Sequence, residues 1–243
     1  MPQKGNTTIK IKNTKYQEKV VFKEGEILSF PDFNLQFVGE NSQKVEINPN
    51  LLFTYYNFKI IDHEGKSLEI SWSSGTGEIS PQIFAVGNRV YQLELKADEM
   101  VVSPADMDIK EYIMQTTSKF LWFKELDVKM ISKRLGFQFT KTEESNEYYD
   151  MFKSSGFGPI ISAELRVKQK DLAHKLLILE INPGSRISQS MIFSRYPKGE
   201  LRVNQPENPA RTAIITKESW GKVSYSFNKN DILIYITLDS IDS

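Results

Sequence analysis

The chain has 243 residues, of which 40% are hydrophobic and 26% charged; this is enough apolar material for one or two folded cores and excludes global disorder. Its 31 basic and 31 acidic residues give zero formal net charge, so the basic surface that nucleic-acid binding requires is not expected. With no cysteine and two histidines, the chain lacks the residues of most metal sites and nucleophilic triads, and we expect no metal, no cofactor and no catalytic residue.

No apolar segment has the length needed to enter a membrane. The longest unbroken apolar run, residues 232–236, is far shorter than the roughly 20 residues of a membrane helix. The first residues also lack the apolar core of a secretory signal. The sequence therefore predicts a soluble, cytoplasmic protein without a membrane span, unless a signal was cleaved before the first residue.

Residues 7–97 alternate apolar and polar side chains at the two-residue period of β-strands, as at Leu68, Ile70 and Trp72. Turn-forming sequences separate the strands at residues 48–50, 62–65 and 87–88. No segment of this half has a helical period. We predict an N-terminal all-β domain, a barrel or a sandwich, over residues 1–100.

The pattern changes where Ser103, Pro104 and an acid two residues later resemble the start of a helix. The period of the apolar residues lengthens from two to 3.6 at the same point. We therefore predict a domain boundary between residues 98 and 105. A C-terminal domain is expected over residues 104–243.

A second helix is predicted over residues 128–135. Asp127 has the properties of its N-cap, and Leu126 is placed to pack against Ile131 as a hydrophobic staple. Gly136 follows the last apolar position, as the residue after a helix often does.

Strand patterns return after residue 136 and are interrupted by a short helix at residues 188–196 and a proline-rich surface loop at residues 197–209. The predicted strands are residues 137–142, 147–152, 161–168, 175–182, 211–216, 222–227 and 232–239. This order predicts an α+β domain with a mostly antiparallel sheet and helices on one face.

Two groups of residues are candidates for a binding surface. A loop unusually rich in small and hydroxylated residues follows Trp72, and the adjacent tyrosines 148 and 149 must point to opposite faces of a strand, so that one is exposed. Hairpin formation and sheet packing explain the same residues without a function. The predicted binding residues are Trp72, Ser73, Ser74, Thr76, Tyr148 and Tyr149.

Three other features have weak functional signals. His63 lies in a turn and His174 before a strand, and neither has a second ligand at metal-binding spacing. Ser219 and Lys222 match the S-x-x-K pattern of some serine enzymes. However, they stand at the entrance to a strand, where residues three apart point to opposite faces.

These patterns predict a non-enzymatic protein that binds another protein. An inhibitor or immunity protein directed against a bacterial toxin or enzyme is one such class. Two alternatives stay open: a hydrolase acting on polysaccharide through paired carboxylates, and a carbohydrate-binding module. The identity of the partner and the oligomeric state are not encoded in any recognisable motif.

Overall fold

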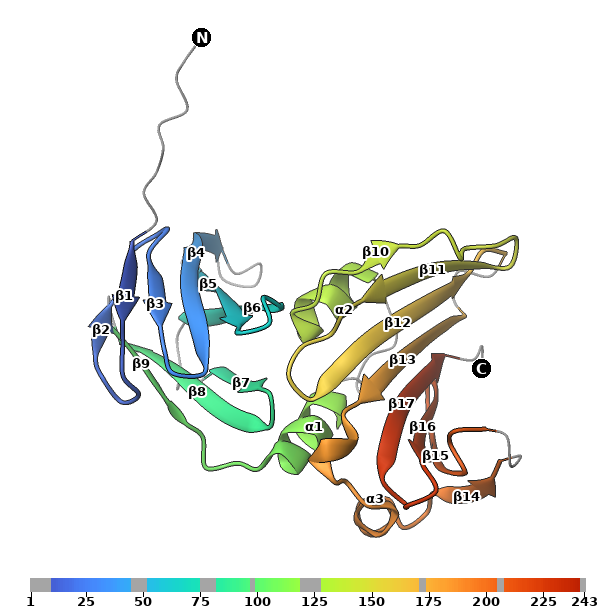
Figure 1. Ribbon diagram of the computed structural model, residues 1–243. Coiled ribbons are helices and arrows are strands. Elements are labelled where there is room, and N and C mark those ends of the chain that lie inside the picture. Colours follow the sequence, from blue (N-terminus) through green and yellow to red (C-terminus); the bar gives the residue numbers. More distant parts are fainter. Residues whose placement is uncertain are drawn as a thin grey trace. The chain divides into compact units, whose positions relative to one another are not determined.

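The structure is a computed structural model that describes residues 10–44, 52–74, 82–96, 99–118, 128–170, 174–204 and 208–240. The chain divides into two compact units, Met1–Val86 with Val90–Asp106, and Gly87–Arg89 with Met107–Ser243. It is strongly β-rich, and none of its three sheets closes into a barrel over the described residues (Figure 1).

The first unit contains a five-stranded sheet, in which Ile11–Asn13 pairs parallel with Ile27–Ser29 and the other neighbouring strands are antiparallel. It also contains a four-stranded sheet, in which Glu99–Pro104 pairs antiparallel with both Val20–Val21 and Arg89–Lys96. In spatial order, the five-stranded sheet consists of β1 (Ile11–Asn13), β3 (Ile27–Ser29), β4 (Phe33–Lys44), β5 (Leu52–Asp62) and β6 (Ser67–Ser74). The four-stranded sheet consists of β2 (Val20–Val21), β9 (Glu99–Pro104), β8 (Arg89–Lys96) and β7 (Gln82–Val86).

The two sheets of the first unit share an aromatic core. The Phe33 ring of the five-stranded sheet lies edge-on to Phe84 at 5.3 Å and to Tyr91 at 5.1 Å, both on the four-stranded sheet. Phe33, Phe84 and Tyr91 are at most 1% exposed. The strand periodicity is thus confirmed, whereas the barrel alternative is wrong because both sheets stay open over the described residues.

Two predicted turns connect strands as expected. Residues 62–65 join β5 to β6 with Gly65 at a φ of 81°, and Gly87 has a φ of 56° between β7 and β8. Glycine accepts these positive angles without steric cost. The third predicted turn, at residues 48–50, lies outside the described residues.

The predicted helix start at residues 103–106 is wrong. Ser103 and Pro104 end β9, opposite Gln92 and Tyr91 of β8. Pairing within this hairpin overrides the local helix signal, and a proline is tolerated at the end of a strand.

The first helix, α1 (Ile109–Ser118), begins later in the chain, where the Asp108 carboxylate accepts a hydrogen bond from the Glu111 amide at 2.8 Å. The window predicted for the domain boundary therefore contains a strand of the four-stranded sheet. That the two units fold independently stays a prediction.

The second unit is built on an eight-stranded antiparallel sheet. Its strands in spatial order are β10 (Thr140–Lys141), β11 (Tyr149–Ser154), β12 (Ile160–Lys168), β13 (Lys175–Ile181), β17 (Leu233–Ser240), β16 (Gly221–Phe227), β15 (Thr212–Glu218) and β14 (Glu200–Val203). The helices among the described residues of this unit are α1, α2 (Val128–Leu135), α3 (Gln189–Arg195) and the short 3-10 helix η2 (Pro183–Ser185). The predicted antiparallel sheet is confirmed.

Helix α2 has the predicted bounds and is followed by Gly136 at a φ of 71°. The predicted cap Asp127 and staple residue Leu126 lie outside the described residues. Helix α3 is also confirmed: the Ser188 hydroxyl accepts a hydrogen bond from the Met191 amide at 3.3 Å, and the helix ends before Pro197.

The predicted loop at residues 197–209 contains an unexpected strand. Residues 200–203, which carry no proline, form β14 and pair with β15 from Thr212 to Ile215. The flanking prolines dominate the composition of this segment and hide the strand within it.

The eight-stranded sheet has an inner and an outer face. Leu165, Leu177, Leu238 and Val223 align across four strands on the inner face, and all are buried. Glu164, Ile178, Thr237 and Ser224 form the adjacent row on the outer face, where each is partly exposed. At the C-terminal end of α3, Tyr196 stacks on the inner-face Tyr225 at 5.3 Å.

Candidate functional site

A groove of about 510 Å³ lies between α1 and α3 in the second unit. Its apolar floor is made of Met114, Ile187 and Ile192, which are at most 3% exposed. Met191 also lines the groove and is 40% exposed, so an apolar side chain is available to a ligand there. Concave, mostly apolar surfaces with a few polar groups are the usual form of binding sites.

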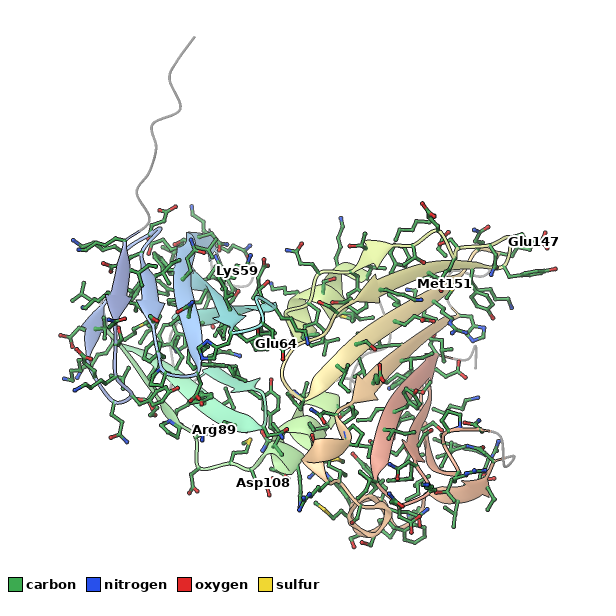
Figure 2. All side chains as sticks on the ribbon, viewed as in Figure 1. Lys59, Glu64, Arg89, Asp108, Glu147 and Met151 are labelled. Atoms are coloured by element: carbon green, nitrogen blue, oxygen red, sulfur yellow. The ribbon has the colours of Figure 1, made fainter. Side chains whose placement is uncertain are left out.

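Charged residues surround this apolar floor. Asp108, Lys110 and Glu111 come from the start of α1, and Arg195 comes from the end of α3. Figure 2 labels Asp108 at the entrance to α1. Acidic and basic groups are balanced, so the rim favours neither an anion nor a cation.

The ion pair between Arg195 and Glu111 links the two helices across the groove, with a distance of 3.0 Å between Nη1 and Oε2. The side chain of Gln115 donates a second hydrogen bond to Glu111, at 3.2 Å. Asp108 accepts the capping hydrogen bond of α1. Both carboxylates of the groove are therefore engaged in holding the helices, which is unlike the acid and base pair of a glycoside hydrolase.

Local sequence explains why the groove is open. In α1, Ile113, Met114 and Thr117 are buried, and the Thr117 hydroxyl donates to the Ile113 carbonyl. In α3, Ile192 is buried whereas its neighbour Met191 is not. A helix of this length presents one narrow apolar stripe to the core, so Met191 is left at the edge of that stripe.

The predicted binding residue Trp72 is a core residue. It is 6% exposed, and its ring lies edge-on to Tyr56 at 5.9 Å. It shares the buried side of β6 with Leu68 and Ile70 because residues two apart point to the same face. The prediction that Trp72 contacts a partner at the surface is therefore wrong, because its side chain is buried.

The residues that follow Trp72 are partly outside the described chain. Ser73 is exposed on β6, and Ser74 is the last residue of that strand. Thr76 lies outside the described residues. Their part in binding stays a prediction.

The predicted tyrosines lie in the second unit, at the hairpin between β10 and β11. Tyr148 is 59% exposed, and Tyr149 is partly buried opposite Lys168 on the outer face. Asn146 fixes the turn by accepting hydrogen bonds from both tyrosine amides, at 2.9 and 3.1 Å. Figure 2 shows Glu147 at the far end of this hairpin. Tyr148 is thus accessible, and its part in binding stays a prediction.

The groove residues were missed by the sequence analysis. Its two walls are far apart in the chain, since Glu111 and Arg195 are separated by 84 residues. One signal was present: the predicted helix over residues 188–196 carries Met191 and Phe193, which are two positions apart and cannot both face the same core. Both prove to be exposed, at 40% and 41%.

The histidines have structural partners. The Nε2 atom of His63 lies 2.9 Å from the Pro31 carbonyl oxygen. The Nε2 atom of His174 lies 3.0 Å from one Asp239 carboxylate oxygen, and Lys222 Nζ lies 2.9 Å from the other. Lys222 therefore pairs with Asp239, whereas Ser219 lies in the turn before β16.

Two kinds of feature are absent from the described residues. No group of three or more His, Cys, Asp or Glu side chains is arranged to hold a metal ion there. In the same part of the chain, no helix is long and apolar enough to cross a membrane.

The chain matches no protein-family model, no curated protein and no solved structure. Its function is therefore inferred from its own residues.

Proposed function

We propose that the protein acts by binding another protein, and that the groove between α1 and α3 is the contact site. The observation that carries the proposal is the exposed Met191 beside the buried apolar floor of Met114, Ile187 and Ile192. Methionine side chains are flexible and polarisable, and they adapt to the irregular side chains of a protein ligand. An apolar anchor of the partner would fill the groove.

The charges at the rim favour a polypeptide over a small charged metabolite. Lys110 and Arg195 stand beside Asp108 and Glu111, so the rim of the groove carries both signs of charge. A protein segment carries both signs next to apolar side chains, whereas a phosphate or a carboxylic acid carries one. A toxin or an enzyme inhibited by this protein is the partner class that fits the predicted role.

Peptide selection can test the proposal without a known partner, because the library itself supplies candidate ligands. A phage-displayed library of random peptides is selected against the full chain, and the affinities of the selected peptides are measured for two variants. Met191→Glu places a charge in the groove. Phe193→Glu is the matched control, because Phe193 is equally exposed on the same helix but does not line the groove.

The selected peptides should contain apolar residues and should bind Met191→Glu at least about tenfold more weakly than the native chain. Their affinity for Phe193→Glu should change less than about twofold. Selection that yields only peptides with equal affinity for both variants would contradict the proposal. Thermal melts should show that neither exposed substitution unfolds the chain.

A glycan array with the same three proteins distinguishes the carbohydrate alternative. No saturable glycan binding is expected. Saturable binding that is lost in Met191→Glu and kept in Phe193→Glu would assign the groove to carbohydrate and overturn the proposal.

A further inference from the structure

Strand β14 is an outer strand of the eight-stranded sheet (Figure 1). All four of its residues are exposed, including the apolar Leu201 at 50% and Val203 at 80%. Within the described residues, β15 is the one strand that pairs with it. An outer strand with exposed apolar side chains and unpaired backbone groups is a site for pairing with a further strand.

The hydrogen-bond pattern shows which backbone groups of β14 point away from β15. The Asn204 amide donates to the Arg211 carbonyl of the adjacent chain segment at 2.8 Å. In an antiparallel pair, successive residues direct their backbone groups alternately toward and away from the partner. Arg202 and Asn204 therefore point their backbone groups toward β15, and Leu201 and Val203 point theirs outward.

The charged residues of β14 are complementary to a second copy of the same strand. Glu200 and Arg202 flank Leu201, and both side chains lie on the outer face, where Arg202 Nε is 3.1 Å from Glu200 Oε1. Antiparallel pairing of two copies about Leu201 places each Glu200 opposite the Arg202 of the other copy. Opposite charges on directly facing residues stabilise a strand pair.

The same pairing brings the two Leu201 side chains together on the inner face, next to the buried Ile214. In this pairing, the outward-pointing Leu201 amide of each copy donates a hydrogen bond to the Leu201 carbonyl of the other copy. Charges on outer strands usually prevent association because two copies present the same sign. Here the two signs alternate about a central leucine, so the charges favour association instead.

We propose that β14 is a self-association surface, and that two copies of the chain form a two-fold symmetric dimer in which their β14 strands pair antiparallel about Leu201. The dimer joins the two eight-stranded sheets into one continuous sheet. Because the contact is a single short strand, association is weak and depends on concentration. The surface does not use the groove residues, so the two proposals can fail separately.

Sedimentation velocity of the full chain from about 1 µM to about 500 µM measures the association. The native chain should change from monomer to dimer across this range. Glu200→Lys makes both flanking residues basic, and Arg202→Glu makes both acidic, so each variant alone should stay monomeric. Lys229→Glu, in the exposed turn between β16 and β17, alters the charge as much as Arg202→Glu and should dimerise like the native chain.

Mixing the two charge variants is the decisive measurement. Lysine and arginine of one chain then face two glutamates of the other, so an equimolar mixture should form a heterodimer although neither component associates alone. A native chain that stays monomeric up to about 500 µM overturns the proposal. So does a mixture that stays monomeric, or a dimer that persists in both single variants. Circular dichroism melts establish that each exposed substitution leaves the fold intact.

Discussion

Asp32 is the acceptor of a hydrogen-bond pair that we expect to stabilise the first unit. The Tyr16 and Tyr91 hydroxyls both donate to its Oδ2 atom, at 2.7 and 2.6 Å. Tyr91 is 1% exposed, and Tyr16 is partly buried against it with stacked rings 5.4 Å apart. Asp32→Ala removes the acceptor of both hydroxyls.

The two hydroxyls should respond differently to this substitution. A buried hydroxyl that loses a charged acceptor costs about 2 kcal/mol, because no water replaces the lost bond. The hydroxyl of the partly exposed Tyr16 can form a hydrogen bond with water instead, so the loss of its bond to Asp32 should lower stability by only about 0.5 kcal/mol. We therefore expect Asp32→Ala to lower the free energy of unfolding by about 2.5 kcal/mol.

Urea unfolding of the full chain measures the total change, and hydrogen exchange of peptides from β4 and β8 localises it to the first unit. The control is Asp32→Ala in a Tyr16→Phe/Tyr91→Phe background, where no hydroxyl remains to be satisfied. Because this background leaves no hydroxyl without an acceptor, Asp32→Ala should lower the free energy of unfolding much less there than in the native chain. An equal loss of stability in both backgrounds would refute the role assigned to the tyrosine hydroxyls.

Three further predictions concern the rest of the fold. Burial raises the pKa of Tyr225, so the phenol loses its proton at lower pH in the unfolded chain than in the folded chain. The free energy of unfolding should therefore be constant below about pH 10 and fall by up to about 1.4 kcal/mol per pH unit above it. Urea unfolding at a series of pH values measures this slope, and Tyr225→Phe should reduce it. Gly221→Ala should lower stability by about 2 kcal/mol, because its Cβ would lie 2.1 Å from the Asp239 carbonyl oxygen; an unchanged melting temperature would contradict this close approach. A fragment of residues 1–106 should melt cooperatively, whereas 1–98 should not because it lacks β9; equal melting of the two would show that β9 is dispensable.

Elements defined by their own sequence were the ones that could be predicted. The alternation of Ala163 and Leu165 with polar residues marks β12, and Gly136 marks the end of α2. The error at Ser103 has a different origin, because the pairing of β9 with β8 is a tertiary contact that overrides a local helix signal. Sequence alone thus predicted most strands and misplaced the start of the first helix.

The candidate site could not be predicted for a related reason. Met114 and Met191 each resemble ordinary core residues of a short amphipathic helix, and the groove exists only because two helices distant in the chain lie together. Trp72 shows the opposite error, since an aromatic next to a serine-rich loop resembles a surface anchor until its strand places it inward. Burial decides both cases, and burial depends on the fold.

The position of β17 has a consequence for synthesis on the ribosome. This strand follows β16 in the chain but lies between β13 and β16, and its pairing with β13 joins Lys175 to Ser240, 65 residues apart. Until residues 233–240 leave the exit tunnel, β13 and β16 of a nascent chain each have one edge without its partner strand. Such edges are prone to pair with other chains, so the wait before β17 inserts is the interval in which chaperone binding would most reduce aggregation.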